Sequence, residues 1–322
     1  MARRFINQLR ENENVIEIYQ MTDRSLRTNK HGNFYLQFVI ADRTGAIDAR
    51  LWNAEEHVLS DLEAGCFIAV EGSVQRFQGT LQLIAKKITR VTPEKLNLND
   101  FVRGGQVDIH SLTARLKELL GELQNQDLVN LADAFLTDEN FMEAFCARPA
   151  GIKLHHATVG GLLEHTVSMM EMSKYTARVY KNFLDPDILL IGVFLHDIGK
   201  IEELSAKGGF SYTDRGQILG HPYLGAALLQ NKIAETEKLT GTPFNPELAM
   251  LLTHMIISHH GSLENGSAKV PMTLEALALH YIDSLDAKLS EFYRYIHEDP
   301  NSDSNLTNYI PGLERKLYKN KL

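Results

Sequence analysis

The stretch Ile188-Leu-Leu-Ile-Gly-Val-Phe-Leu-His-Asp-Ile-Gly-Lys200 joins an unbroken apolar run to a polar cluster. The run from 188 to 195 is far shorter than the roughly 20 apolar residues that cross a bilayer, so it predicts a buried helix of a globular domain. His196 and Asp197 then lie at the buried end of that helix, where an unpaired carboxylate is costly. Lys200 shares a helix face with His196. The stretch therefore predicts a buried polar site that neutralises Asp197.

The chain on both sides of this stretch has a helical pattern. Apolar residues recur at three- and four-residue spacing from Ser111, a predicted N-cap, to Tyr295. The predicted helices span residues 112–123, 128–135, 139–146, 159–180, 186–195, 221–235, 246–258 and 274–295. We expect this half of the chain to form an all-α domain.

The N-terminal part is rich in β-branched and aromatic residues that alternate with polar ones. After a first strand near Val15, the predicted strands span residues 34–40, 46–52, 66–77 and 80–91. Turn residues at 42–45 and 78–79 close two hairpins, and residues 53–63 predict a short helix. The order β-β-β-α-β-β is that of the OB-fold, a small all-β barrel that binds oligonucleotides and oligosaccharides.

Alternation along the predicted third strand separates its two faces. Ile47, Ala49 and Leu51 form the apolar face, which leaves Arg50 and Trp52 facing outward. Tyr35 of the preceding strand faces the same way. We interpret Tyr35, Arg50 and Trp52 as a stacking platform for bases, with Arg76 in a basic track on the same barrel. The alternative is that Trp52 only covers an end of the barrel.

The composition fits two globular domains. The chain has 322 residues, of which 44% are hydrophobic and 23% charged. Its net charge of −8 argues against a protein that coats nucleic acid by bulk charge, although it leaves room for a local basic groove. Up to residue 93 there are 12 Lys and Arg against 11 Asp and Glu, and beyond it 21 against 30. We predict an OB-fold nucleic-acid-binding domain at 1–93, a linker and helical connection at 94–148, and the helical domain at 149–322.

The sequence indicates neither a signal peptide nor a paired or metal-binding cysteine. Asn7, Gln8 and Arg10 interrupt any apolar core of a signal peptide, and we expect a cytoplasmic protein without a membrane partner. Cys66 and Cys146 fall in different predicted regions without CxxC spacing, so we expect neither a disulfide nor a cysteine zinc site.

Histidine is concentrated in the helical half, which holds 11 of the 13 histidines beyond residue 100. Imidazole and carboxylate ligands together suit divalent first-row metals such as Mn, Fe, Co, Ni or Zn. A single histidine on an apolar face is more often a hydrogen-bonded core residue. Several in one domain favour a metal site. The histidines and aspartates that occupy such positions are His165, His196, Asp197, His221, His254, His259, His260, His280 and Asp283.

Five short motifs follow one another in this half. They are Gly-Leu-Leu-Glu-His165-Thr, Leu195-His-Asp-Ile-Gly-Lys200, Gly220-His-Pro222, Ser258-His-His-Gly261 and Tyr281-Ile-Asp283-Ser-Leu-Asp286-Ala-Lys288. Their order resembles that of the HD-domain metal-dependent phosphohydrolases, over roughly residues 150–295. With an OB-fold in front, nearly the whole chain is similar to the YhaM-type 3′→5′ exoribonucleases of bacteria.

The resemblance implies a binuclear metal site. One ion would be held by His165, His196, Asp197 and Asp283, and the second by Asp197 as a bridge with the histidines that follow. These histidines are His221, His259 and His260.

Further roles stay open at this point. His254 lies five residues before His259 and is either a ligand, an outer contact or a substrate contact. Asp286 either orients a ligand or is a solvated charge. His155 and His156 are candidate phosphate contacts, or else solvated loop residues.

The predicted activity is metal-dependent 3′→5′ exoribonuclease cleavage of single-stranded RNA, with single-stranded DNA as a further substrate. Two divalent ions, foremost Mn, would activate water for phosphodiester hydrolysis and release nucleoside 5′-monophosphates. Asp197 and Lys200 are the predicted catalytic residues, with Lys200 stabilising phosphoryl charge. One alternative is an HD phosphohydrolase of small nucleotides or cyclic dinucleotides. Another is a non-enzymatic nucleic-acid-binding adaptor with a structural metal. The sequence predicts no oligomeric state.

Overall fold

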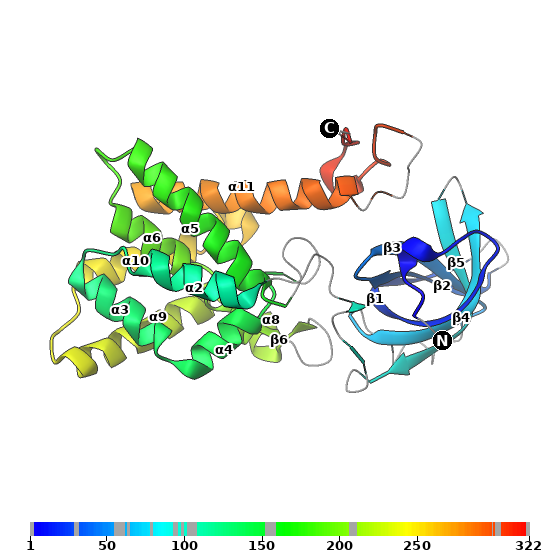
Figure 1. Cartoon of the computed structure of the whole chain (residues 1–322), viewed down its shortest axis with the longest axis horizontal. Helices are drawn as coiled ribbons and strands as arrows, with labels where there is room; N and C mark the ends of the chain where they lie inside the picture. Colours follow the sequence, from blue (N-terminus) through cyan, green and yellow to red (C-terminus); the bar gives the residue numbers. More distant parts are fainter. Residues whose placement is uncertain are drawn as a thin grey trace. The chain divides into compact units, whose positions relative to one another are not determined.

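The computed structural model divides the chain into two compact units (Figure 1). One unit comprises residues 1–106, 207–210 and 291–322, and the other residues 107–206 and 211–290. The structure describes residues 3–28, 32–54, 62, 65–77, 80–92, 96–97, 100–101, 108–151, 159–205, 211–297, 299 and 304–319.

The N-terminal unit contains a closed five-stranded barrel. Its strands are β1 (Asn14–Thr28), β2 (Phe34–Asp42), β3 (Gly45–Trp52), β4 (Phe67–Phe77) and β5 (Thr80–Val91), preceded by the 3-10 turn η1 (Ile6–Gln8). The strands pair in the order β1-β2-β3-β5-β4, and all pairs are antiparallel except β3 with β5. The predicted OB-fold barrel is confirmed. The helix predicted at 53–63 lies mostly outside the described residues.

The barrel core follows from strand alternation. Leu36, Phe38 and Ile40 of β2 and Ala49 of β3 are almost fully buried, because every second residue of a strand points to the same side. The opposite side of β3 carries Trp52, which is 42% exposed. The predicted division of β3 into an inner and an outer face is therefore confirmed.

The second unit is helical, as predicted. Its helices are α2 (Ile109–Leu120), α3 (Gln126–Leu136), α4 (Glu139–Ala147), α5 (Gly161–Val179), α6 (Pro186–Leu195), α7 (Lys200–Glu203), α8 (Asp214–Leu219), α9 (His221–Thr240), α10 (Pro246–Ser258) and α11 (Leu274–His297), the last of which extends beyond Ser290. The shorter elements are β6 (Leu204–Ser205), β7 (Ser211–Tyr212) and the 3-10 turns η4 (Leu263–Asn265) and η5 (Pro311–Leu313), with η5 outside this unit. Every helix in the described ranges is too short or too polar to span a bilayer.

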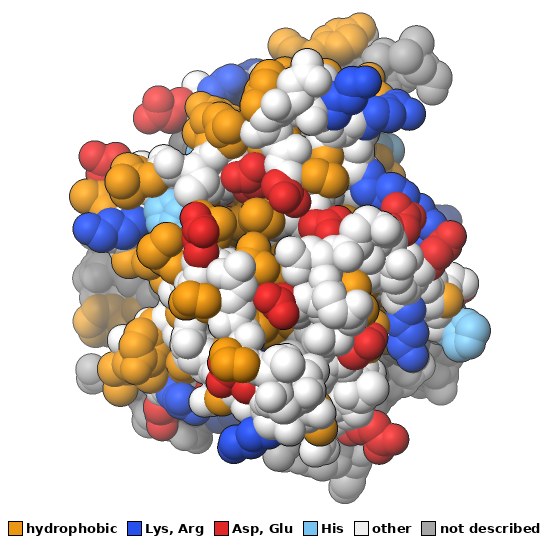
Figure 2. Space-filling view, turned by 90° about the vertical axis from the view of Figure 1, so that its left-hand side faces the viewer, with side chains coloured by type: hydrophobic (Ala, Val, Ile, Leu, Met, Phe, Trp, Pro, Cys, Tyr) orange, Lys and Arg blue, Asp and Glu red, His pale blue; other side chains and the backbone are white. Residues whose placement is uncertain are grey.

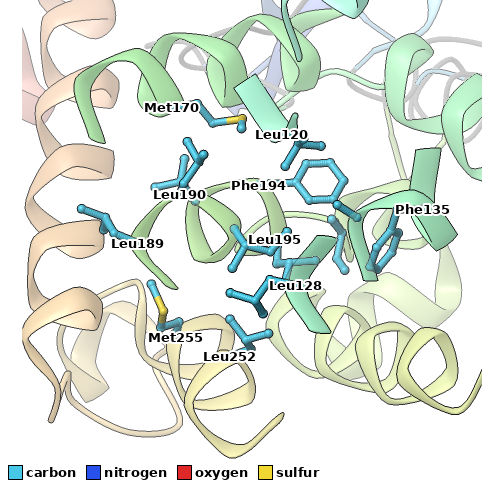
Figure 3. Close-up of a cluster of buried hydrophobic side chains, with 14 of the residues drawn as sticks. Leu120, Leu128, Phe135, Met170, Leu189, Leu190, Phe194, Leu195, Leu252 and Met255 are labelled. Atoms are coloured by element: carbon cyan, nitrogen blue, oxygen red, sulfur yellow. The ribbon is translucent and has the colours of Figure 1, made fainter. Parts of the chain in front are cut away.

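Helix α6 is the centre of the helical unit. Its residues from Leu189 to Leu195 are all buried. Figure 3 shows four of them, Leu189, Leu190, Phe194 and Leu195, among side chains of α2, α3, α5 and α10. Burial on all sides explains why α6 is apolar along its whole length. Helices α2, α3 and α4, in the region predicted as a connection, pack into this same core.

Polar side chains hold the beginnings of several helices. Asp108 accepts a hydrogen bond from the backbone N–H of Ser111, so α2 begins earlier than predicted and Ser111 is not its N-cap. Asp187, in the first turn of α6, accepts the backbone N–H groups of Gln124 and Asn125 ahead of α3. These carboxylates also suit the positive ends of the helix dipoles.

Asp and Glu side chains are spread over the face of the molecule in Figure 2.

Candidate active site

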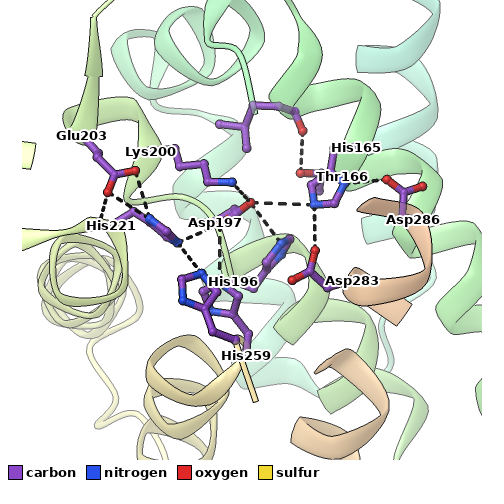
Figure 4. Close-up of polar contacts among 12 residues, drawn as sticks. His165, Thr166, His196, Asp197, Lys200, Glu203, His221, His259, Asp283 and Asp286 are labelled. Carbon is purple, nitrogen blue, oxygen red and sulfur yellow. Dashed lines mark hydrogen bonds and ion pairs between the residues drawn. The ribbon is translucent and has the colours of Figure 1, made fainter. Parts of the chain in front are cut away.

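The predicted polar residues converge in the helical unit (Figure 4). His165 comes from α5, His196 and Asp197 directly follow α6, His221 begins α9, His259 and His260 follow α10, and Asp283 lies in α11. Five of these seven side chains come from helix ends, because a helix end can carry a polar residue into a core without interrupting the apolar helix face. The arrangement brings together residues that are more than 100 positions apart in the sequence.

Asp197 lies at the centre of this cluster, and its two oxygens face different histidines. Oδ2 lies 3.2 Å from Nε2 of His196 and 3.8 Å from Nε2 of His165. Oδ1 lies 3.4 Å from Nε2 of His221 and 3.6 Å from Nε2 of His259. The carboxylate therefore joins two subsets of imidazoles.

The donor atoms fit a metal site. The candidate ligand atoms of His165, His196 and Asp197 lie within 4.8 Å of one another, and so do those of three further histidines. These are His221, His259 and His260. Oδ1 of Asp197 is buried without a hydrogen-bond partner in the described part of the chain. Since a buried, unsatisfied carboxylate oxygen is costly, a cation between these groups accounts for its position.

Hydrogen bonds at Nδ1 orient two of the imidazoles. Nδ1 of His196 lies 2.7 Å from the carbonyl oxygen of Val193, and Nδ1 of His259 lies 2.7 Å from that of Ile256. A carbonyl only accepts, so Nδ1 carries a proton in both rings, and in a neutral ring Nε2 then keeps its lone pair. Both lone pairs are thus available to a metal.

Asp286 lies behind His165. Its Oδ2 is 2.7 Å from Nδ1 of His165, while its Oδ1 accepts the hydroxyl of Ser168 at 2.8 Å. Burial disfavours a charged imidazole, but the hydrogen bonds to Asp283 and Asp286 outweigh it and raise the pKa of His165 to about 9. Asp286 is buried and contacts a ligand candidate from outside the cluster, which favours the orienting carboxylate over the solvated charge among its two predicted roles.

Glu203 is a site residue that sequence reasoning missed. Its carboxylate lies 3.0 and 3.1 Å from Nδ1 of His221 and accepts the backbone N–H of the same residue at 2.9 Å. Burial would raise the pKa of Glu203, but its bonds with His221 dominate and lower it. The signal in the sequence was slight, because Glu203 follows the motif by three residues and is adjacent to a second glutamate.

Lys200 is held against the central carboxylate. Its Nζ lies 2.6 Å from Oδ2 of Asp197. Burial opposes both charges, yet their attraction holds the pKa of Asp197 well below its usual range and raises the pKa of Lys200. Asp283 is ionised for a similar reason: burial is outweighed by its contact with His165, 3.4 Å away, and its pKa is lowered.

His259 and His260 are presented by a tight turn. Burial lowers the pKa of both imidazoles, so they are neutral, as metal ligands must be. Gly261 has a φ of +82°, and a Cβ there would lie 2.2–2.5 Å from the ring of His280. Nδ1 of His280 in turn lies 2.8 Å from the carbonyl oxygen of His259. His280 thus supports the backbone of the turn.

His254 lies apart from the two ligand clusters of the described residues. Nε2 of His254 accepts the backbone N–H of Met272 at 2.9 Å, which ties α10 to the segment before α11. Burial lowers the pKa of His254, and the residue is not among the two ligand clusters found in the described ranges. His155 and His156 lie outside the residues that the structure describes.

The barrel brings the predicted platform residues together. Tyr35 and Trp52 are directly opposite on β2 and β3, with ring centroids 4.9 Å apart. The guanidinium carbon of Arg50 lies 5.8 Å from the ring of Trp52 and 5.2 Å from that of Phe77. Phe77 is 44% exposed and was missed by sequence reasoning.

Arg76 faces away from this platform. It precedes Phe77 on β4, and successive strand residues point to opposite sides. Its side chain pairs with Glu11 at 3.6 Å.

Comparison with known proteins identifies both units. The HD domain family matches residues 162–288, and an OB-fold nucleic acid binding domain family matches residues 20–91. The 3′-5′ exoribonuclease YhaM of Bacillus pumilus is 32% identical over 292 residues, which are 90% of this chain and 89% of the relative. YhaM of Bacillus subtilis is 34% identical over 261 residues, 81% of this chain and 80% of the relative. The chain belongs to the YhaM family of 3′-5′ exoribonucleases.

The YhaM family assignment agrees with the geometry. All of the converging histidines and aspartates lie within the matched HD domain, which implies dependence on a divalent metal. The platform residues lie within the matched OB-fold domain. A solved OB-fold domain of replication protein A from Methanococcus maripaludis also aligns, with 21% identity, a TM-score of 0.24, and coverage of 30% of this chain and 98% of that domain. A similarity at this level carries no functional argument.

Proposed function

We propose that this YhaM family member is a metal-dependent 3′→5′ exoribonuclease that uses two divalent ions to release nucleoside 5′-monophosphates from single-stranded RNA. The observation that carries the proposal is the position of Asp197, whose two oxygens face two different sets of imidazoles. The family membership supplies the polarity of cleavage.

Two ions fit the ligand set better than one. His165, His196 and Asp283 lie on one side of Asp197. The other side has His221 and His259, and Nε2 of the neighbouring His260 lies 3.1 Å from Nε2 of His221. Six side chains plus a bridging carboxylate exceed the ligand number of a single tetrahedral ion. We propose manganese as the physiological metal, with Fe, Co, Ni or Zn as alternatives that suit the same donors.

When bound, the two ions supply Lewis-acid activation of the attacking water and neutralise charge on the phosphoryl group. The chain contributes the positions of the groups around them. Lys200 is charged and sits beside Asp197. Its ammonium can stabilise negative charge that develops on a phosphoryl oxygen during cleavage. Asp197 stays ionised because Lys200 and the neighbouring imidazoles outweigh its burial.

The barrel supplies the binding of single strands. Tyr35, Trp52 and Phe77 offer ring faces beside the guanidinium of Arg50. Bases of any identity can stack on such rings while a guanidinium contacts phosphate. This mode does not read the 2′-hydroxyl. We therefore propose single-stranded DNA as a weaker, secondary substrate and the cytoplasm as the compartment, where the free Cys66 and Cys146 stay reduced.

A substrate panel tests the proposal. The purified full chain is incubated with Mn²⁺ or with chelator and equal amounts of single-stranded RNA, matched single-stranded DNA, duplex RNA, a cyclic dinucleotide and a nucleoside triphosphate. We expect Mn²⁺-dependent release of nucleoside 5′-monophosphates, fastest from single-stranded RNA. Faster turnover of the cyclic dinucleotide or the triphosphate would replace the proposal with a small-nucleotide phosphohydrolase. No turnover of any compound, with oligonucleotide binding retained, would favour a binding protein with a structural metal.

A further inference from the structure

Two carboxylates contact candidate metal-binding histidines through Nδ1, one carboxylate for each subset of imidazoles (Figure 4). Asp286 contacts Nδ1 of His165 at 2.7 Å, and Glu203 contacts Nδ1 of His221 at 3.0 Å. Both carboxylates are themselves buried, with residue exposures of 8% each. They are therefore shielded from solvent and act on one imidazole each.

The carboxylate determines which ring nitrogen carries the proton. An ionised carboxylate only accepts hydrogen bonds, so Nδ1 of His221 must donate to Glu203 and Nε2 of a neutral ring keeps its lone pair. That lone pair faces Oδ1 of Asp197 and Nε2 of His260, at 3.4 and 3.1 Å. Glu203 thus presents a metal-binding atom toward the cluster.

The other imidazoles of the two subsets are oriented differently. His196 and His259 donate to backbone carbonyl oxygens. A carboxylate partner makes the imidazole a stronger donor to a metal than a neutral carbonyl does. Each subset thus contains one imidazole that contacts a carboxylate and one that contacts a carbonyl oxygen, and the second subset also contains His260.

Glu203 is fixed in place by the backbone around it. Its carbonyl oxygen accepts the N–H of Thr213, and its side chain accepts the N–H of His221 in addition to the ring. The hydroxyl of Thr213 bonds to the carbonyl oxygen of Glu202. The bonds to Thr213 and to the backbone of His221 therefore hold the carboxylate and the imidazole at a defined separation.

We propose that Glu203 is a positioning residue that sets the tautomer and orientation of His221 for one metal position, as Asp286 does for His165 at the other. This inference rests on the proposed two-ion site. It predicts that the affinities of the two positions can be altered separately from outside the cluster.

Glu203→Gln tests the inference with little change in shape. A glutamine can still accept the backbone N–H of His221 through its oxygen. Its amide nitrogen, however, would take the place of Oε2, 3.0 Å from Nδ1, as a donor. A donor at this position opposes a proton on Nδ1 and favours the tautomer with the proton on Nε2, which blocks the metal-binding atom. Glu202→Gln is the matched control, because Glu202 is the adjacent glutamate and pairs with Arg215 at 2.7 Å instead.

Metal binding is measured by calorimetric titration of the metal-free full chain with Mn²⁺. We expect two binding events in the wild type and in Glu202→Gln. In Glu203→Gln one event weakens 10- to 100-fold, as is typical when the partner of a ligand is removed. Asp286→Asn weakens the other event, and the double variant weakens both. Circular dichroism in chelator checks that each variant is folded.

The outcomes separate the two proposals. A single Mn²⁺ per wild-type chain would overturn the two-ion function. Two events in the wild type with unchanged affinities in Glu203→Gln would overturn the role of Glu203 alone. Weakening of the same event by both Glu203→Gln and Asp286→Asn would overturn the assignment of one carboxylate to each position. If Glu203→Gln is unfolded in chelator, a wild-type-like titration of Asp286→Asn overturns the paired assignment, and loss of one event supports it.

Discussion

Gly199 places α9 against the residues that follow α6, and an alanine there should disturb the site from the backbone. A Cβ on Gly199 would lie 2.1 Å from the carbonyl oxygen of His221 and 2.5 Å from the backbone nitrogen of Gly225. Both atoms belong to the first turn of α9. Because they are backbone atoms, no side-chain rotation relieves the overlap.

The size of the effect follows from that overlap. Ordinary contacts of a methyl group are about 3.5–4 Å, so Gly199→Ala must separate the two backbones by more than about 1 Å. Overpacking of this kind typically costs about 1–3 kcal/mol in the free energy of unfolding. His221 moves with the turn, and its Nε2 leaves its position 3.4 Å from Oδ1 of Asp197. We expect about 10- to 100-fold weaker metal binding at that position, as for other losses of ligand orientation.

The assay has two parts. Thermal unfolding in chelator, followed by the helical circular dichroism signal, should show a midpoint lowered by about 2–4 °C for each kcal/mol, the usual scale for a domain of this size. Mn²⁺ titration should show the weakened event. Gly312→Ala is the control, because a Cβ there meets no atom within 4 Å. A Gly199→Ala protein with wild-type midpoint and wild-type Mn²⁺ affinity would refute the packing argument.

Three other outcomes are expected. Trp52→Ala should weaken binding of single-stranded oligonucleotides about 5- to 150-fold, because stacking contributes about 1–3 kcal/mol per base; hydrolysis of a small phosphodiester should be unchanged, and equal loss of both would contradict the platform. The bond to Lys232, 2.7 Å away, lowers the pKa of Asp138. Its stabilisation, about 1 kcal/mol for a partly exposed pair, is present at neutral pH and lost as pH falls through that lowered pKa; Asp138→Asn should show a smaller loss of stability on acidification, and an equal loss would contradict the pairing. Since the pKa of His165 is raised to about 9, metal binding there displaces a proton; Mn²⁺ affinity at that position should rise up to tenfold per unit between pH 6 and 8, and an affinity independent of pH would count against His165 as a ligand.

The fold was predictable from local patterns. The apolar run before His196 indicated the buried helix α6, and alternation from Ile47 to Trp52 separated the faces of β3. In both patterns the type of each residue shows directly whether that residue is buried or exposed, so the element can be read from the sequence. The predicted start of α2 was wrong. Asp108 and Ser111 are both favourable N-cap residues, and the sequence does not indicate which of them caps the helix.

The site was predictable only in part. Convergence of the histidines on Asp197 matches the motif resemblance. Glu203 and Phe77 were missed because their roles come from tertiary contacts, with His221 and Arg50 respectively, that have no periodic signature in the sequence. A charged residue in a short helix and an aromatic residue at a strand end are common on ordinary surfaces.

We expect the cluster around Asp197 to shorten RNA from its 3′ end. The most direct measurement is a time course on one single-stranded RNA carrying the label either at the 5′ or at the 3′ end, with Mn²⁺, for the wild type and Asp197→Ala. The wild type should release the 3′ label at once as a mononucleotide and shorten the 5′-labelled strand progressively, and Asp197→Ala should do neither. Internal fragments from the outset, or wild-type rates with folded Asp197→Ala, would contradict this expectation.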